Sequence, residues 1–385
     1  MKTNLKKLLY SGVTLMSLGV LAACSSTSSS TTTSSSAATS QTSVATTSNN
    51  STSSDSSSSS IDWSALPTTE VTLSNDGLKI TEGGTYILTG STTAGVTVET
   101  DANVRIILAG AEISSSGTAA INVINADNVE LEIKDGTTNT VKDSSNHTDT
   151  NIEGAIHVEA DLTITGNGSL TVEGNFQDGI VSTDDLVVNS GNITVTAVDD
   201  GIRGKDSLTI NGGTINVTAG GDGIKSTNDT DTTKGYTTIT GGDITVKAGD
   251  DAIKAETALT IDGGTITVPE SVEALEGTNI TINGGTIDVY GSDDAINASS
   301  TTSSDIYIKV TGGDLKVAVG SGDTDAFDAN GDIYISGGTI AVTAPTSAFD
   351  FDGTAELTGG TVTVNGEQIT QIVATGPGAG GHGGW

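Results

Sequence analysis

The chain has 385 residues, with 50 Gly, 4 Pro, 3% aromatic residues and 16% charged residues. This length suffices for several domains, but short bursts of Thr, Ile and Val favour one body built from strands. The formal net charge of −33 argues against nucleic acid as a partner, because phosphate contacts require Lys and Arg. The single cysteine, Cys24, excludes an intramolecular disulfide and a cysteine-rich zinc site.

Residues 1–23 predict a lipoprotein signal peptide. Lysines at the start precede an apolar stretch from Leu8 to Val20, which is too short to span a bilayer. The stretch ends in Leu21-Ala22-Ala23-Cys24, which resembles a bacterial lipobox. That resemblance implies cleavage before Cys24 and a lipid group on its thiol; the alternative is an ordinary secretory signal in which Cys24 has no role. We expect an extracytoplasmic protein, held at the cell surface by a lipid anchor in the membrane.

Residues 24–60 consist almost only of Ser, Thr and Ala, and residues 375–385 are rich in Gly. Neither segment carries enough apolar side chains to form a core. We therefore expect a disordered tether at 24–60, a folded body at 61–374, and a Gly-rich tail at 375–385.

One sequence unit recurs along the folded body. Its most regular mark is an acidic residue, a small residue and an apolar residue, which start at Asp200, Asp222, Asp251, Glu273, Asp294, Asp325 and, with Ser in the first place, Ser347. The successive spacings are 22, 29, 22, 21, 31 and 22 residues. A fixed period near 22 is typical of a solenoid, and the two long steps predict loop insertions, from Ser226 to Thr237 and from Ala298 to Ser304.

Pairs of glycines keep step with this mark and separate short alternating strands. Gly212-Gly213, for example, stands between Leu208-Thr209-Ile210 and Thr214-Ile215-Asn216-Val217. Gly supplies the positive φ that tight turns need. Each unit therefore holds three strands, and the sequence predicts an all-β fold, a single-stranded parallel β-helix of about a dozen coils of roughly 22 residues. A β-sandwich is the alternative, but it would need antiparallel hairpins without this register.

Stacked coils bring equivalent residues into columns. We expect the small residues, from Gly201 to Ala348, to face outward and to floor a shallow groove. The acidic residues would form one wall. The other wall changes sign along the chain, since it reads Arg203, Lys225, Lys254, Glu276, Asn297, Asp328 and Asp350.

Acidic residues in the second half of the solenoid have no Lys or Arg nearby in the repeat. Stacked carboxylates either take up protons or bind a cation, and oxygen ligands in this number suit Ca²⁺. The alternative is a solvated acidic ladder that keeps the solenoid soluble. The predicted calcium ligands are Asp293, Asp294, Asn297, Asp323, Asp325, Asp328 and Asp350.

Four aromatic residues also occupy repeat positions. Tyr307 and Tyr334 are assigned to the outward Thr position of the middle strand, where a stacked pair would offer a platform to a sugar or would simply stabilise the sheet. Phe327 and Phe349 occupy the inward Ile position and are expected in the core.

The repeat resembles a family of bacterial surface lipoproteins called carbohydrate-binding domain-containing proteins. The resemblance rests on runs such as Val198-Asp199-Asp200-Gly201-Ile202-Arg203 and Ile282-Asn283-Gly284-Gly285-Thr286-Ile287. It implies a right-handed parallel β-helix that binds Ca²⁺ and plant polysaccharides such as polygalacturonate and cellulose. The family is also similar to family 9 pectate lyases, which use an aspartate-bound Ca²⁺ and a lysine base. Ala in place of Gly in several turns, and Ser347 in the acidic column, depart from the family pattern.

Three functions follow from these patterns. The first is calcium-dependent binding of an acidic or cellulose-like polysaccharide by a monomer, with Arg203, Lys225, Lys254, Tyr307 and Tyr334 as sugar contacts. The second is a polyuronate lyase with Lys225 or Lys254 as the base, although the neighbouring aspartates would raise the pKa of either lysine. The third is a wall-associated adhesin or spacer.

Overall fold

A computed structural model of the protein describes residues 61–322 and 324–375. The described residues belong to one compact unit, Ser60–Trp385. The predicted signal peptide, Cys24, the tether, Asp323 and nearly all of the Gly-rich tail lie outside the described residues. Within the described part, no helix combines the length and apolarity that a membrane span requires.

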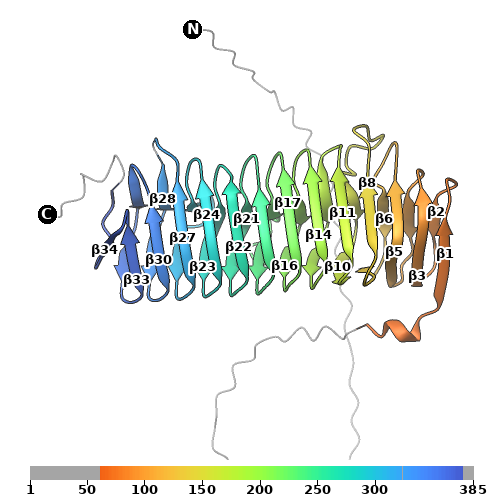
Figure 1. The fold of residues 1–385 in the computed structure, drawn as a ribbon, viewed down its shortest axis with the longest axis horizontal. Coiled ribbons are helices and arrows are strands. Elements are labelled where there is room, and N and C mark those ends of the chain that lie inside the picture. The colour runs from red at the N-terminus through yellow and green to blue at the C-terminus, as the bar shows by residue number, and fades with distance from the viewer. Residues whose placement is uncertain (1–60, 323, 376–385) are drawn as a thin grey trace, which may run out of the picture. The chain divides into compact units, whose positions relative to one another are not determined.

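The described residues form a parallel β-helix whose coils stack from β1 to β33 (Figure 1). A short 3₁₀ turn at Trp63–Ala65 precedes the first coil. The first face, which carries the acidic repeat mark, contains a dozen strands in register: β2 (Leu78–Ile80), β4 (Val96–Glu99), β6 (Ile121–Asn125), β9 (Gly154–Val158), β12 (Asp178–Ser182), β15 (Ile202–Gly204), β18 (Ile224–Ser226), β21 (Ile253–Ile261), β23 (Leu275–Ile282), β25 (Ile296–Ala298), β28 (Asp325–Ala329) and β31 (Ser347–Phe351).

The second face includes the C-terminal parts of β21 and β23, whose N-terminal parts belong to the first face. Its other strands are β1 (Thr68–Leu73), β3 (Gly84–Thr92), β5 (Val104–Ser114), β7 (Asn128–Ile133), β10 (Asp161–Gly166), β13 (Asp185–Val188), β16 (Ser207–Ile210), β19 (Tyr236–Ile239), β26 (Tyr307–Val310), β29 (Asp332–Ile335) and β32 (Ala355–Leu357).

The third face begins with the C-terminal parts of β3 and β5. It continues with β8 (Thr138–Lys142), β11 (Ser169–Gly174), β14 (Asn192–Ala197), β17 (Thr214–Ala219), β20 (Asp243–Lys247), β22 (Thr265–Glu270), β24 (Thr286–Gly291), β27 (Asp314–Val319), β30 (Thr339–Thr343) and β33 (Thr361–Val364). The last strand, β34 (Glu367–Ile369), pairs antiparallel with β33. Because β3, β5, β21 and β23 bend across a corner, hydrogen bonds link all strands into one sheet wrapped around the core.

The core consists of stacked apolar residues, as the repeat predicts. On the first face, one inward position is filled by Ile180, Ile202, Ile224, Ile253, Leu275, Ile296, Phe327 and Phe349 on successive coils, and all are buried. The two phenylalanine rings stack with centroids 5.2 Å apart. The predicted core position of both rings is therefore confirmed.

The prediction that the small residues face outward is wrong. Ala252, Ala274 and Ala295 are fully buried, and a Cβ added to Gly223 would lie 2.2 Å from Cγ1 of Val246. The chain turns just before each strand of the first face, so the small residue and the next apolar residue both point inward and strict alternation fails. This column is a packing seam against the valines of the third face.

The acidic residues that precede the small residues stack on successive coils, and we term this column the corner ladder. Oδ1 of Asp178, Asp200 and Asp222 accepts the backbone N–H of the acidic residue on the next coil, at 3.1, 3.0 and 2.9 Å. Asp294 accepts in the same way from Asp325 at 2.8 Å. A buried backbone N–H needs an acceptor, and the stacked carboxylates supply one at each of these turns.

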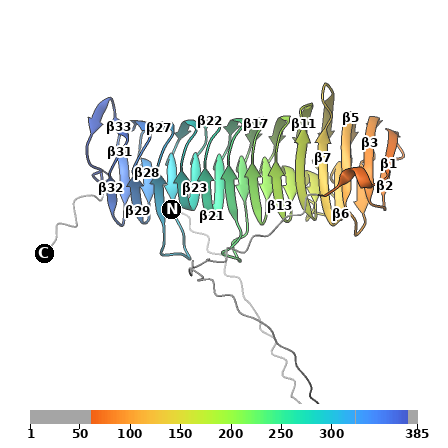
Figure 2. The ribbon, with the colours of Figure 1, turned by 90° about the horizontal axis from the view of Figure 1, so that it is seen from below.

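Both predicted insertions are present as loops, at residues 227–235 between β18 and β19 and at residues 299–306 between β25 and β26. Figure 2 shows the two loops projecting from the same side of the solenoid, near β21 and β23. A third insertion, residues 143–153, follows β8. The first two loops therefore flank two coils that have no insertion.

The buried seam yields a stability prediction. Gly223→Val would force a branched side chain against Val246 and the carbonyl of Ala252, so we expect the free energy of unfolding to fall by about 2 kcal/mol. The matched control is Thr218→Val on the exposed side of β17, which should change it by less than about 0.5 kcal/mol. Urea unfolding of both variants checks this, and equal stabilities would contradict the inward seam.

Candidate functional site

The outward residues next to the corner ladder form a column of charged and polar side chains, which we term the charged column. Strand register places them on successive coils in the order Arg203, Lys225, Lys254, Glu276, Asn297, Asp328 and Asp350. The column thus changes sign between Lys254 and Glu276. The change separates two halves with different electrostatics.

In the N-terminal half, the bases of the charged column neutralise the corner ladder. Nζ of Lys225 lies 2.6 Å from Oδ2 of Asp200 and 2.9 Å from Oδ2 of Asp222. Although burial lowers the pKa of Lys225, the charge of Asp222 and hydrogen bonding to Asp200 outweigh it, and the net shift of that pKa is upward. Arg203 contacts Asp178, on the preceding coil, and also Glu153.

In the C-terminal half, Glu276 pairs with Lys254 across the change of sign, whereas Asp328 and Asp350 form no ion pair with a basic residue among the described residues. Burial, together with the charges of Asp293, Asp325 and Asp350, raises the pKa of Asp294 to about 6. Burial and the charges of Asp294, Asp325 and Asp350 raise the pKa of Asp328 to about 7. The structure therefore brings the described members of the predicted calcium set into one neighbourhood.

Three tighter carboxylate groups occur among the described residues, each with ligand atoms within 4.8 Å of one another. They are Asp178 with Asp199 and Asp200, Asp222 with Asp250 and Asp251, and Asp251 with Glu273 and Glu276. Asp178 is not among the site residues that the sequence predicts above. Asp178-Gly179-Ile180 stands 22 residues before Asp200 and carries the same mark, so the repeat contained the signal.

The third carboxylate group lies where the charged column changes sign. Nζ of Lys254 is 2.7 Å from Oδ2 of Asp251 and also contacts Glu276. Burial and a side-chain hydrogen bond with Glu276 raise the pKa of Asp251 to about 8, and burial raises the pKa of Glu273 to about 7. Asn297 is 8% exposed, and its Oδ1 has no hydrogen-bond partner among the described residues.

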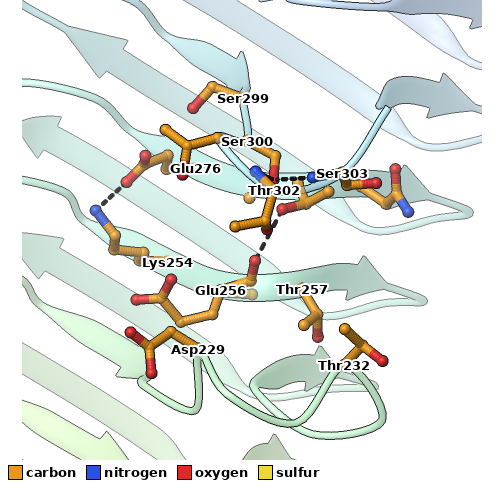
Figure 3. Close-up of a pocket in the computed structure, with 15 residues that line it drawn as sticks. Asp229, Thr232, Lys254, Glu256, Thr257, Glu276, Ser299, Ser300, Thr302 and Ser303 are labelled. Atoms are coloured by element: carbon orange, nitrogen blue, oxygen red, sulfur yellow. Dashed lines mark hydrogen bonds and ion pairs between the residues drawn. The ribbon is translucent and has the colours of Figure 1, made fainter. Parts of the chain in front are cut away.

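A groove with a volume of about 470 Å³ begins at this charged group and extends between the loops 227–235 and 299–306. Figure 3 shows Lys254, Glu256 and Glu276 on its floor, which β21 and β23 provide. Asp229 and Thr232 line one wall, and Ser299–Ser303 line the other. Hydroxyl, carboxylate and ammonium groups in this density can form hydrogen bonds to a hydroxyl-rich ligand.

The predicted tyrosine pair is not a stacked platform. Tyr307 pairs with Asp332 on the next coil, whereas Tyr334 pairs with Lys309, so the two rings are offset by two residues. Only Tyr334 replaces the outward Thr, because Lys309 aligns with Thr281. The Tyr334 hydroxyl donates to Asp332 at 2.7 Å. The assignment of Tyr307 to that position was wrong.

The raised pKa values predict how stability depends on pH. Five carboxyl groups bind protons more tightly in the folded protein than in the unfolded chain, namely those of Asp178, Asp251, Glu273, Asp294 and Asp328. Their stabilising effect is thus complete below their ordinary pKa values, near 4, and is lost as the pH rises through about 6 to about 8. In EDTA, we expect the free energy of unfolding to decrease over this range.

Urea unfolding as a function of pH measures this effect. Asp328→Asn should reduce the decrease, whereas Asp314→Asn, on the exposed side of β27, should leave it unchanged. A metal-free protein with its greatest stability near pH 8 would contradict the assignment.

Comparison with known proteins agrees with this architecture. The family model of carbohydrate-binding domain-containing proteins matches residues 74–326. A protein of that description from Acetivibrio thermocellus is 33% identical over 135 residues, which cover 33% of this chain and 47% of the relative, so the chain spans about half of that relative's length. The solved structure of the polysaccharide lyase-like protein from C. thermocellum, a gadolinium derivative, has a TM-score of 0.53 and 32% identity, and the match covers 54% of this chain and 93% of that one. The chain therefore belongs to the family of carbohydrate-binding domain-containing proteins.

Proposed function

We propose that this protein binds a polysaccharide in the groove between the loops 227–235 and 299–306. The observation that carries the proposal is the groove itself, a polar hollow on two coils without insertions, in a chain of a carbohydrate-binding domain family. Insertions on coils three steps apart leave an opening about 14 Å wide between their backbones. An extended sugar chain fits such an opening better than a protein domain does.

Calcium is the second part of the proposal. The chain carries a formal charge of −33, so an acidic polysaccharide needs a cation to bind it. In the N-terminal half, lysine and arginine side chains already occupy the space between the carboxylates. In the C-terminal half the charged column offers carboxylates instead, and carboxylate and amide oxygens are the ligands that Ca²⁺ prefers.

The residues that would hold Ca²⁺ are Asp294, Asp325, Asp328 and Asp350, with Asn297 at the N-terminal side. The unpartnered Oδ1 of Asn297 and the pKa of about 7 for Asp328 fit a site that lacks a positive charge. When bound, Ca²⁺ would neutralise these carboxylates and could coordinate a uronate carboxylate. We further propose that Cys24 anchors the protein by lipid at the cell surface, where polysaccharides are accessible.

A polyuronate lyase is the second candidate, because the similar solved structure is described as polysaccharide lyase-like. A lyase needs a base that removes a proton next to the sugar carboxylate, with a pKa near the working pH. Lys225 and Lys254 are each held by two acidic side chains, and the pKa of each is raised. Both lysines are thus protonated at neutral pH, which supports binding over cleavage.

The groove assignment predicts a specific loss of binding. Glu256→Trp would fill the groove, and we expect the affinity for a bound polysaccharide to fall at least about tenfold, or about 1.4 kcal/mol. Asn216→Trp adds the same bulk to the exposed side of β17 and should bind as the wild type does. Calorimetric titration with oligosaccharides selected on a glycan array measures both, and equal losses or no loss would contradict the groove.

The calcium assignment predicts a pH-dependent stabilisation. At pH 8, added Ca²⁺ should raise the melting temperature and permit binding of polygalacturonate, and EDTA should abolish both effects. At pH 5 the gain should be smaller, because protons compete for the carboxylates. Asp328→Asn should weaken the response, and Asp314→Asn should not. Polygalacturonate binding at full strength in EDTA would contradict a calcium bridge.

A further inference from the structure

The third insertion, residues 143–153, contains a buried histidine that belongs neither to the groove nor to the charged column. The side chains of His147 and Asp143 are fully buried, and Nε2 of His147 lies 2.9 Å from Oδ2 of Asp143. Neither atom has another hydrogen-bond partner among the described residues. Nδ1 of His147 is 2.5 Å from the carbonyl oxygen of Ile152. One imidazole ring therefore joins the start of the insertion to its end.

The two contacts of the ring fix how many protons the histidine–aspartate pair must hold. A carbonyl oxygen can only accept, so Nδ1 of His147 carries a proton. Nε2 faces a carboxyl oxygen at hydrogen-bond distance, and one further proton must lie between these two atoms. The pair is then either an imidazolium with a carboxylate or a neutral imidazole with a carboxylic acid, and both forms contain the same two protons. Without the second proton, two lone pairs would face each other in a buried site.

Asp143 and the ring of His147 are both attached to the neighbouring coil. Oδ1 of Asp143 accepts the backbone N–H of Asn175 at 2.6 Å, and the carbonyl oxygen of Asp143 accepts Nδ2 of Asn175 at 3.0 Å. The ring of His147 stacks on Phe176, with centroids 4.3 Å apart. Asn175 and Phe176 lie in the turn between β11 and β12. The ring therefore docks the insertion on that turn.

Few other polar contacts hold the tip of the insertion. Thr148 donates from its N–H and its hydroxyl to the carbonyl oxygen of Gly117, at 2.9 and 3.0 Å. Within the described part of the chain, the other hydrogen bonds of residues 144–151 stay inside the insertion. The end of the insertion is fixed, because the carbonyl oxygen of Glu153 accepts the N–H of Asp178 at 3.1 Å. The tip thus depends on His147 and Thr148 for its place on the solenoid.

Other titratable groups lie on the insertion and on nearby strands. They are Asp149 and Glu153 of the insertion, Lys142 of β8, His157 of β9, Glu173 of β11, Asp178 of β12 and Arg203 of β15. Glu153 is paired with Arg203, and burial lowers the pKa of His157 to about 4, so its ring is neutral at neutral pH. Among the described residues, Asp143 is the one charged group in ion-pair contact with His147.

The direction of the pH effect follows from the same contacts. Burial raises the pKa of Asp143 above its ordinary value, against the opposing effects of the Asn175 N–H and the charge of His147. A carboxyl group with a raised pKa stabilises the folded form fully below its ordinary pKa, near 4, and this contribution is lost as the pH rises through the raised value. The geometry gives the same sign, because the closed insertion needs a shared proton that the released one does not need.

We propose that His147 and Asp143 form a proton-dependent clasp, which holds residues 144–152 on the solenoid at low pH and releases them as the pH rises. Release would uncover Phe176, which is half-buried while the ring of His147 covers it. The clasp would thus link the shape of the N-terminal coils to the pH of the surroundings. It is independent of the groove and of the cation site, which lie on later coils.

Hydrogen–deuterium exchange of the full chain in EDTA, given as protection factors for residues 144–152, tests the clasp at pH 5 and pH 9. In the wild type we expect protection of this segment to fall at least about tenfold between the two values, while β14 keeps its protection. Asp143→Asn should stay protected at both, because its amide N–H can donate to Nε2 of a neutral His147 without titrating. His147→Phe keeps a ring on Phe176 but removes both nitrogens, and should be unprotected at both.

Thr148→Val is the matched control. It removes the hydroxyl that donates to Gly117 and leaves the clasp intact, so protection should be lower at both pH values while the tenfold change remains. Equal protection of the wild type at pH 5 and pH 9 would overturn the proposal, and so would a wild-type pH response in Asp143→Asn. The wild-type comparison remains decisive if a variant fails to fold, and no result here depends on sugar binding.

Discussion

Each coil turns at a corner where the chain leaves the third face and enters the first face. The backbone N–H groups at this corner need hydrogen-bond acceptors. Aspartates on the preceding coils provide them, with donor–acceptor distances from 2.8 to 3.1 Å. This arrangement works only if coils stack in parallel and in register. It also buries a line of carboxylates along the solenoid, and buried carboxylates need protons or positive partners.

The two halves of the solenoid meet this need differently. Arg203, Lys225 and Lys254 supply positive charge within the chain on three successive coils, and the lysines are too strongly paired to act as bases. Beyond Glu276 the same column carries acids, and burial together with the charges of Asp294, Asp325 and Asp350 raises the pKa of Asp328 to about 7. A divalent cation in this half would complete the compensation that the lysines begin. It would also explain how a strongly acidic protein holds an acidic sugar.

Much of this structure could be predicted from the sequence, because its repeat is regular. The period of about 22 residues, the two insertions and the inward Ile and Phe column all follow from spacing and alternation. Alternation fails at the corners, where two successive residues face inward, and this is why the small column was placed on the wrong side. Tyr307 was misplaced by two residues, because the strand register that follows the loop insertion 299–306 cannot be read from the spacing in the sequence.

The groove could be predicted only in part. The insertions that wall the groove were found, but their projection over the same two coils depends on the path of each loop.

The central claim is that the acidic half of the charged column is a cation site. A crystal structure of the calcium-loaded protein, with anomalous difference maps, tests it most directly. The account predicts a peak coordinated by Asp294, Asp328 and Asp350, at the coils where the lysines of the column have ended. A map without a peak among these carboxylates, from crystals grown in saturating Ca²⁺, would contradict it.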